Sequence, residues 1–437
     1  MARKVFISFL GTSPYGECIY SRGEFRSQKV RFIQEATLRY HFGQSPWSEG
    51  DAAYILLTPL AETKNWFDDG QTNRDGFKIE WQGLKSRLDA MSLPFVPATL
   101  NNLPDGNNEQ EIMEIFMRVF DVLQDGDELY FDITHGYRYL PMLTLVLGNY
   151  AKFLKKVTVK SITYGNYEAR DKATNIAPII DLTMLSDLQD WTHAAADFIE
   201  NGSPEKMVAL AESDLKPILK EAKGGNKVAT ETKRLSNLLI PYAHDFHTCR
   251  GINIYHGTNV KPLKAQLAVV EEVLLEPMNP VIDKLRADVA SFSDSPSADN
   301  CFKAAWWCYE RGLYQQAVTF LEEAAISFFC LRHSIPIDDV KQRELVTKAA
   351  YCLKNSVPEP DWNVEEELKP SVRELCFDKL LSDRKMIEAY FAVVSLRNDV
   401  NHCGFRPNPM PSKRIIDNIK AAIETIEHLL NDPSHAS

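Results

Sequence analysis

The chain has 437 residues, of which 44% are hydrophobic, and a formal net charge of −11. This length predicts two domains, each able to bury its own core, and the composition excludes a mostly disordered chain. The negative charge argues against a broad, sequence-independent nucleic-acid surface, so any contact with RNA has to be local. No apolar run approaches 18 residues, and the eight cysteines show no CxxC spacing. We therefore expect reduced thiols, no membrane partner and a cytoplasmic location.

The N-terminal part alternates short apolar runs with amphipathic stretches. We predict strands at residues 5–10, 53–59, 95–98, 128–133 and 157–164, and helices between them at residues 27–41, 75–91, 108–123 and 139–154. Strands separated by single helices form a parallel, doubly wound sheet with helices on both sides. In such a sheet, ligands bind at the carboxyl ends of the strands.

Two of these strand ends have residues that suit a phosphate. Small hydroxyl residues and glycines expose backbone N–H groups, and the second segment also precedes a helix N-terminus. Tight turns alone would account for the glycines, but not for Thr, His and Arg together at one strand end. Neither GxGxxG nor a Walker motif is present, which disfavours a dinucleotide-binding or P-loop site. The predicted ligand-binding residues are Gly11, Thr12, Ser13, Thr134, His135, Gly136 and Arg138.

The middle of the chain, residues 183–300, reads as helical, with a connecting helix at residues 185–199. Its cluster of His244, His247 and Cys249 invites a zinc-site interpretation, but the spacing matches no standard module. Arg250 and His256 form a possible second nuclease pair, which Gly251 interrupts. We predict no metal site here and attribute these side chains to packing or substrate contacts.

The C-terminal part is strongly helical and ends in the sequence RNDVNH, residues 397–402. Residues 302–329 predict an apolar helical stripe with a break at Gly312, and residues from 386 onward predict a helix that Gly404 ends. RNA cleavage without a metal needs a group that moves protons and a cation that stabilises charge on the phosphate oxygens. Arg397 and His402 supply such a pair. The alternative is a solvated helix end with a histidine favoured by the helix dipole.

Motifs at both ends of the chain resemble one known family. FLGTSPY, residues 9–15, and DITHGYRYLP, residues 132–141, are similar to the two phosphate-facing motifs of CARF domains, which are Rossmann-like sensors. RNDVNH, together with residues 302–329, resembles the HEPN ribonuclease domain. The chain therefore resembles the CARF–HEPN ribonucleases of type III CRISPR defence, in the Csx/Csm accessory family, with the Csx branch favoured.

This resemblance implies an α/β Rossmann-like CARF domain at residues 1–182, a helical linker at 183–300 and an all-α HEPN core at 301–437. It also implies a homodimer or higher even-numbered oligomer that a cyclic oligoadenylate activates allosterically, without another cofactor. The THGYR form favours the tetra-adenylate over the hexa-adenylate ring.

The implied reaction is a metal-independent cleavage of single-stranded RNA, in which the 2′-OH attacks the adjacent phosphorus and leaves a 2′,3′-cyclic phosphate. His402 is predicted to move protons and Arg397 to stabilise the phosphorane, with Asn398 and Asn401 orienting these groups. Which group acts as acid and which as base stays open. Glu322 or Glu323 on the facing helix is expected to hold Arg397, if this pair is not merely a solvated helix face.

Three other functions stay open. One is a CARF sensor that regulates a partner without ribonuclease activity. Another is a ring nuclease that degrades its own activator, with Thr12, Ser13 and His135 as participants. A nicotinamide- or nucleotide-dependent enzyme lacks its glycine motif in this chain.

Overall fold

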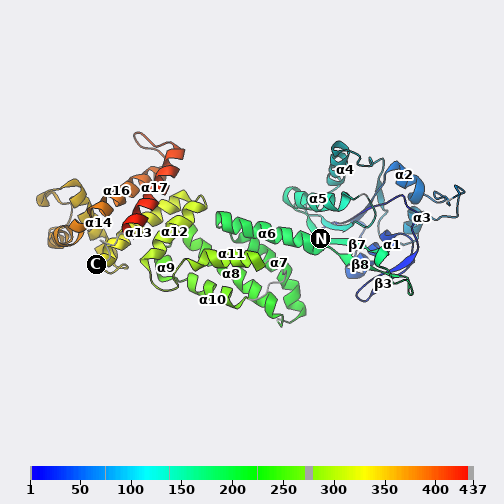
Figure 1. The fold of residues 1–437 in the computed structure, drawn as a ribbon, viewed down its shortest axis with the longest axis horizontal. Helices are drawn as coiled ribbons and strands as arrows, with labels where there is room; N and C mark the ends of the chain where they lie inside the picture. Colours follow the sequence, from blue (N-terminus) through cyan, green and yellow to red (C-terminus); the bar gives the residue numbers. More distant parts are fainter. Residues whose placement is uncertain (1, 74, 137, 224, 271–278, 432–437) are drawn as a thin grey trace. The chain divides into compact units, whose positions relative to one another are not determined.

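The computed structural model describes residues 2–73, 75–136, 138–223, 225–270 and 279–431. The chain divides into two compact units, residues 1–189 and 190–437, and helix α6 (Thr183–Asn201) runs across this division. The first unit is an α/β domain and the second is helical (Figure 1). The predicted three-part division at residues 182 and 300 stays a prediction.

The first unit is built on one eight-stranded sheet in the order β3-β2-β8-β7-β6-β1-β4-β5. Its strands are β1 (Lys4–Phe9), β2 (Cys18–Arg22), β3 (Phe25–Val30), β4 (Ala52–Leu56), β5 (Ala98–Leu100), β6 (Glu128–Asp132), β7 (Thr158–Gly165) and β8 (Ile176–Asp181). The five strands from β7 to β5 pair in parallel, which confirms the predicted Rossmann-like core.

Helices cover both faces of this sheet. They are α1 (Ile33–Gln44), α2 (Pro59–Ala61), α3 (Leu84–Asp89), α4 (Glu109–Asp121) and α5 (Leu140–Lys155), with a π-helix η1 (Glu62–Trp66) and a 3-10 helix η2 (Tyr167–Ala169). Alternation along β1 assigns the faces, because neighbouring side chains of a strand point to opposite sides. Ile7 belongs to the core beneath α4 and α5, whereas Phe6 belongs to the core beneath α1 and α3.

Two predicted helices are wrong in part. Residues 27–30 of the predicted helix 27–41 belong to β3, and only the second half of that prediction is helical. Of the predicted helix 75–91, only α3 forms, and Thr72 and Lys78 make an isolated antiparallel bridge. The predicted strand 95–98 lies a few residues early, since β5 begins at Ala98.

The hairpin β2–β3 and the strand β8 add antiparallel pairs to the predicted parallel sheet. β2 pairs antiparallel with β3 and parallel with β8, and β7 pairs antiparallel with β8. β2 and β8 lie more than 150 residues apart in sequence, so their pairing follows from tertiary packing that no local pattern reports.

The second unit consists of helices joined by short connections. They are the end of α6, α7 (Glu205–Glu221), α8 (Lys227–His247), α9 (Gly251–His256), α10 (Val260–Val269), α11 (Asn279–Ala290), α12 (Ala298–Glu310), α13 (Tyr314–Arg332), α14 (Val340–Asn355), α15 (Lys369–Glu374), α16 (Arg384–Asn401) and α17 (Ser412–Leu430). Short 3-10 and π segments lie between α14 and α16: η4 (Glu359–Asp361), η5 (Glu366–Leu368), η6 (Leu375–Lys379) and η7 (Leu380–Asp383).

Helix α13 lies in the packed core of the second unit, where it contacts α12, α14, α16 and α17. Its predicted apolar stripe is confirmed, because Ala317, Phe320 and Leu321 are buried. The predicted break at Gly312 is also confirmed, since this glycine has a φ of +70° between α12 and α13. Within the described residues, no helix is both long and apolar enough to cross a membrane.

Candidate functional site

Two buried amide side chains hold the loop after β1 in place by hydrogen bonds to its carbonyl groups. The Asn65 side-chain amide donates to the carbonyls of Gly11 and Ser13 at 2.8 and 2.9 Å, and the Gln71 amide donates to the Thr12 carbonyl at 3.1 Å. Gln71 also donates to Asn65 at 2.9 Å. Three successive carbonyls are therefore turned into the protein.

Fixing these carbonyls leaves the amide groups of the loop available to a ligand. The backbone N–H groups of Thr12 and Ser13 donate no hydrogen bond to any residue that the structure describes. Gly11 lies closely under Tyr15, because an added Cβ at Gly11 would come within 2.2 Å of the Tyr15 hydroxyl. Unpaired N–H groups on a fixed loop form an anion-binding site.

The loop after β6 starts from a buried carboxylate, Asp132. The Ser8 hydroxyl of β1 donates to its Oδ2 at 2.7 Å, and Thr134 donates to its Oδ1 through its hydroxyl at 2.5 Å and its N–H at 3.2 Å. Gln34 of α1 donates to Ser8 at 2.9 Å. Burial is the largest influence on this carboxyl, and it raises the pKa of Asp132 from 3.8 to about 6.

Thr134 holds the strand ends of the site together through its hydroxyl group. Its hydroxyl donates to Asp132 and accepts a hydrogen bond of 2.8 Å from the Gly165 N–H at the end of β7. The hydroxyl thus joins the ends of two neighbouring strands, and its single proton is already used. Thr134 was predicted to bind a ligand, but its hydroxyl cannot donate to one without leaving Asp132.

His135 stacks on Tyr15, and the two rings connect the two strand ends. Their centroids lie 3.9 Å apart with an angle of 20° between the planes. Burial lowers the pKa of His135 to about 3, so its imidazole is neutral near pH 7, and its buried Nε2 has no hydrogen-bond partner among the described residues. His135 therefore contributes an uncharged ring to the wall of the site rather than a positive charge.

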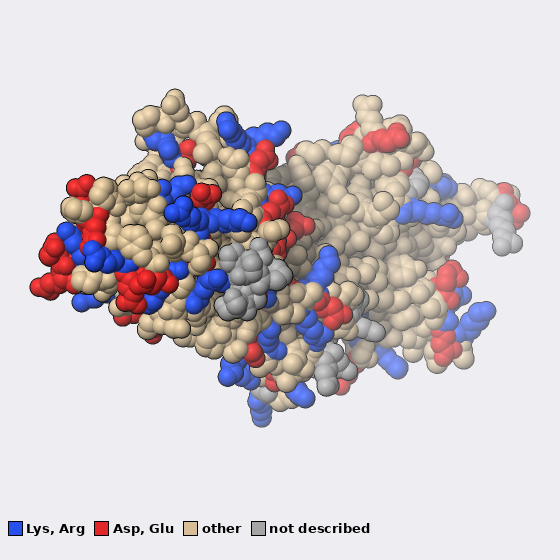
Figure 2. Space-filling model, turned by 60° about the vertical axis from the view of Figure 1, so that its left-hand side comes forward, with Lys and Arg blue, Asp and Glu red and all other residues tan. Residues whose placement is uncertain are grey.

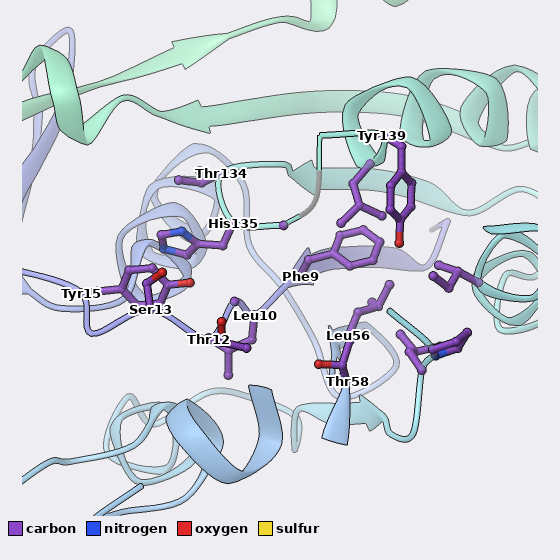
Figure 3. A pocket seen from close by; sticks show the side chains of 16 residues that line it. Phe9, Leu10, Thr12, Ser13, Tyr15, Leu56, Thr58, Thr134, His135 and Tyr139 are labelled. Atoms are coloured by element: carbon purple, nitrogen blue, oxygen red, sulfur yellow. The ribbon is translucent and has the colours of Figure 1, made fainter. Parts of the chain in front are cut away.

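A cavity of about 290 Å³ opens between the two loops (Figure 3). Thr12, Ser13, Tyr15 and His135 lie at one side of the view and Phe9, Leu56 and Tyr139 at the other. All predicted residues from Gly11 to Ser13 and from Thr134 to Gly136 line it. A second cavity of about 350 Å³ adjoins it and shares Ser13, Tyr15, Thr134 and His135.

A glycine and an arginine complete the loop after β6. Gly136 has a φ of +152°, and an added Cβ would come within 2.3 Å of Leu140, so this position requires glycine. Arg138 is exposed, and Asp132 is bonded to Ser8 and Thr134 instead of to Arg138. Tyr137 of the predicted motif lies outside the described residues.

The C-terminal motif lies on the last turns of α16, opposite α13. Arg397 Nε lies 3.3 Å from Glu322 Oε2, with the arginine side chain 39% exposed and the glutamate 13% exposed. Burial raises the pKa of Glu322, and the Arg397 charge counteracts this rise. Glu323 instead contacts Arg343 at 2.5 Å. The expected pairing of Arg397 is thus confirmed for Glu322.

His402 is the C-cap of α16 and is exposed. Its ring has no hydrogen-bond partner among the described residues. Asn401 accepts a hydrogen bond of 3.2 Å from Gln315 of α13, and Asn398 accepts only from the His402 N–H, at 3.0 Å through its backbone carbonyl. Arg397 is therefore anchored to α13, whereas the imidazole is open to solvent.

The same motif contains a buried aspartate that the sequence reasoning did not single out. Asp399 is 1% exposed, and its Oδ2 accepts from the Met410 N–H at 3.1 Å and lies 4.0 Å from Arg406. It ties the end of α16 to the segment that leads into α17. We infer that Asp399 positions the motif rather than contacting a ligand.

The histidines of the middle region do not assemble a metal centre. In the described ranges, no three His, Cys, Asp or Glu side chains come together in a way that could hold a metal ion. Arg250 precedes α9 and lines a cavity of about 410 Å³ with Tyr255 and Arg343, whereas His256 at the other end of α9 does not line it. Arg250 and His256 are thus not brought together in this cavity.

Residues 89–168 match the family model described as the CARF domain of the CRISPR system endoribonuclease Csx1. Over 288 residues, the chain is 22% identical to the CRISPR-associated protein MJ1674 of Methanocaldococcus jannaschii. These two matches support a CARF-containing CRISPR-associated protein of the Csx1 type. The alignment covers 64% of this chain and 40% of that relative, so the chain spans well under two thirds of its length. The CARF match includes the loop after β6 but neither the Gly11–Ser13 loop nor the RNDVNH motif.

Several residues that shape the CARF site were missed in the sequence. Asn65 and Gln71 lie more than 50 residues from the loop that they hold, and Gln34 lies 26 residues from Ser8. No local pattern marks such amides. Tyr15, by contrast, belongs to the FLGTSPY motif, so the motif itself was a signal that could have pointed to this residue.

The buried carboxylate of the CARF site predicts a pH-dependent stability. A carboxyl with a folded-state pKa of about 6 and an unfolded value of 3.8 contributes stability that is present below about pH 4 and lost as the pH rises through 6. We expect Asp132→Asn, which cannot ionise, to gain ~2 kcal/mol of stability relative to wild type between about pH 4.5 and about pH 7.5. Chemical denaturation at both pH values measures this, and a difference that does not change with pH would contradict the raised pKa.

Proposed function

We propose that this protein is an endoribonuclease of type III CRISPR antiviral defence that a cyclic oligoadenylate activates allosterically. One observation carries the proposal. A CARF domain with an open cavity at its strand ends shares a chain with a helix that presents a glutamate-anchored arginine and an unpartnered histidine. The first site suits an anionic ring, and the second suits phosphodiester chemistry.

The CARF cavity supports binding of ring phosphates by backbone groups. The N–H groups of Thr12 and Ser13 have no acceptor among the described residues, and Arg138 is an exposed cation on the same loop as the lining residues Thr134 to Gly136. A neutral His135 adds an uncharged ring, whose buried Nε2 has no partner in the described part of the chain. The tetra-adenylate ring is the proposed activator, on the resemblance of THGYR to the Csx branch.

An exposed apolar surface supports a homodimer. We call it the α4–α5 face: Met113 and Met117 of α4, and Met142, Val146 and Phe153 of α5, are 41–77% exposed. Soluble monomers rarely expose such contiguous apolar residues. A second copy of the chain is the proposed occupant, because a two-fold symmetric ring fits two identical cavities related by the same symmetry.

The proposed reaction is a transesterification of single-stranded RNA. A base removes the proton of the 2′-OH, the 2′-oxygen forms a bond to the adjacent phosphorus, and the bond to the 5′-oxygen breaks. An acid protonates that oxygen, so the products are a 2′,3′-cyclic phosphate and a 5′-OH. His402 is the proposed proton carrier, and Arg397 stabilises the phosphorane oxygens. Asn398 and Asn401 orient these groups, and no metal takes part.

Glu322 supports this role for Arg397 in a specific way. A 3.3 Å pair to a largely buried carboxylate restricts the guanidinium while leaving 39% of the side chain open to a substrate. A cation that is held before the substrate arrives loses less entropy in the transition state. The surroundings of His402 impose no such restraint, which suits a group that has to exchange protons with solvent.

A second candidate function is cleavage of the activator within the CARF cavity. Its supporting observation is the unpartnered Nε2 of His135 beside Ser13 and Thr12. A neutral imidazole can accept a proton from a ribose hydroxyl. Loss of the intact ring from a reaction without RNA would support this activity, and His135→Ala should then abolish it.

The catalytic proposal predicts the effect of two substitutions. Arg397→Ala and His402→Ala should each lower ring-stimulated RNA cleavage by on the order of a hundredfold or more, because each removes a transition-state interaction. Ring binding should change little, and EDTA should have no effect. Cleavage of a fluorogenic single-stranded RNA measures the rate.

The chain offers its own matched control in the second Arg–His pair. Arg250→Ala and His256→Ala make the same chemical changes on α9 and its N-cap, and we expect near wild-type cleavage. If the α9 variants lost activity and the α16 variants kept it, the assignment of the nuclease site would be wrong.

Ring recognition predicts a shift in activation rather than in maximal rate. Arg138→Ala should raise the ring concentration for half-maximal cleavage about tenfold, because one charge-assisted contact is lost. The rate at saturating ring should stay unchanged, since Arg138 touches no RNA. Arg26→Ala, another exposed arginine of the CARF unit, is the control. A lower maximal rate with unchanged ring affinity would argue against this sensor site.

The α4–α5 face predicts an oligomeric state that one charge can disrupt. Val146 is 57% exposed, and Val146→Asp should convert a dimer to a monomer because an interface buries the new carboxylate. Val96→Asp places the same group at an 87% exposed loop position and should leave the dimer intact. Light scattering after gel filtration measures the mass, and a wild-type monomer in the presence of ring would refute the dimer.

A further inference from the structure

The loop that joins α16 to α17 carries a phenylalanine whose ring lies almost wholly in solvent. We call residues 402–411 the α16–α17 loop. Phe405 is 91% exposed, the largest exposed fraction of any large hydrophobic side chain that the structure describes. Its ring contacts no other ring and no cation in this part of the chain. A single exposed apolar side chain is ordinary on a protein surface, so its exposure alone assigns no role to Phe405.

The position of Phe405 next to His402 is what sets it apart. The Phe405 N–H donates to the His402 carbonyl at 2.8 Å, which closes a turn. Such a turn keeps the Cα atoms of its first and last residues within about 7 Å of each other. Phe405 therefore lies beside the residue that we propose carries protons in RNA cleavage.

Hydrogen bonds tie the α16–α17 loop to α16 at several points. The Asp399 carboxylate accepts from the Met410 N–H at 3.1 Å, and the Asp399 carbonyl accepts from the Gly404 N–H at 3.0 Å. Arg406 donates to the Ser395 carbonyl at 3.1 Å. Every second residue from 407 to 411 is proline, which restricts the backbone further. A ring on such a fixed loop loses less conformational entropy on binding than a ring on a flexible one.

Two cations lie at the end of the same loop. Lys413 and Arg414 belong to the first turn of α17, and both side chains are exposed without an ion-pair partner among the described residues. This turn holds no acidic residue. The helix dipole disfavours a cation at a helix N-terminus, so these charges do not stabilise α17. They give a chain with a net charge of −11 a local positive group at the loop that follows His402.

An exposed aromatic ring followed by unpaired cations suits a single strand of nucleic acid. An aromatic side chain stacks on any base, since every base has a π face, and cations bind the phosphates that link the bases. In a double helix the bases are already paired and stacked on one another, so a ring at the protein surface reaches only an unpaired base. A peptide could cover the phenylalanine, but it offers no regular series of anions to the cations.

We propose that Phe405 stacks on an unpaired base of the RNA substrate next to the scissile phosphate, and that Lys413 and Arg414 bind phosphates of the same strand. This assignment rests on the proposed function, because it presumes that His402 acts on RNA. It adds a substrate-binding surface to the reacting groups and gives a physical reason for a preference for single strands.

The stacking half of the proposal is tested by the kinetics of activator-stimulated cleavage with the full-length protein. Phe405→Leu should raise the KM for a fluorogenic single-stranded RNA roughly five- to a hundredfold, as for the loss of one base-stacking side chain, and should leave kcat within about twofold of wild type. Phe405→Tyr keeps the aromatic face and should keep KM within about twofold. Phe77→Leu, at a 70% exposed phenylalanine of the first unit, is the control.

The phosphate-binding half is tested by the salt dependence of the same reaction. Replacing Lys413 and Arg414 together by alanine should raise KM and lower the slope of log KM against log salt by about 1.4, since each phosphate contact to a single strand contributes about 0.7. Arg384→Ala with Lys385→Ala is the matched control, because this adjacent exposed pair occupies the first turn of α16, ~27 Å of helix away from His402. The control should keep the wild-type slope.

The outcomes separate this inference from the proposed function. If wild type with activator cleaves no RNA, the proposed function is wrong and this inference falls with it. If wild type cleaves RNA and the Phe405→Leu and paired cation variants keep its KM and its salt slope, the reaction stands and the α16–α17 loop is not a substrate surface. If Phe405→Leu instead converts a dimer to a monomer in light scattering, the phenylalanine is a contact between copies and the stacking proposal is overturned.

Discussion

The buried carboxylate of Asp132 is the constraint on which both CARF cavities depend. It joins the ends of β1 and β6 through Ser8 and Thr134, and Thr134 extends the same chain of hydrogen bonds to Gly165 of β7. Burial raises the pKa of this carboxyl more than the hydrogen bonds from Ser8 and Thr134 lower it, so the charged form is destabilised. The same hydrogen bonds fix the positions of the strand ends. The loops that line the cavities start from these ends, and their geometry follows from this network.

The elements predicted correctly are those whose own residues show a pattern typical of a strand or a helix. The strands β1, β4, β6 and β7 are short buried apolar runs, and α4 and α5 show a helical period, with Asn108 capping α4 through the Glu111 N–H. The hairpin β2–β3 was missed because its strands, CIYSR and FRSQKV, show neither a sustained apolar run nor a regular alternation, and β3 lies just before a true helix. Its place in the sheet depends on β8, which is remote in sequence.

The residues of the candidate sites fall into the same two groups: those that a local motif marks and those that only the fold brings to the site. The motif residues Thr12, Ser13 and His135 could be predicted, because their types and their place after a strand indicate a ligand. The amides of Asn65 and Gln71 could not, since their role is to satisfy carbonyls that only the folded loop brings near them. The pair of Arg397 with Glu322 lies between these cases: both helices were predicted, but the choice of Glu322 over Glu323 depends on how α13 faces α16.

The second cavity of the CARF unit, which Tyr164 and Gly165 help to line, lies at the strand pair that leads out of this unit. Tyr164 and Gly165 of β7 pair with Ile180 and Ile179 of β8, and β8 passes directly into α6. The start of α6 is held by Asp181, which accepts from the Thr183 N–H at 2.8 Å and from Arg22 at 2.8 Å. A ligand in this cavity would therefore contact the end of β7, which pairs with the strand that leads into α6, the helix that runs across the division between the two units. Any coupling through this path has to be reciprocal for binding, so occupation of the nuclease site by an RNA analogue should tighten the ring.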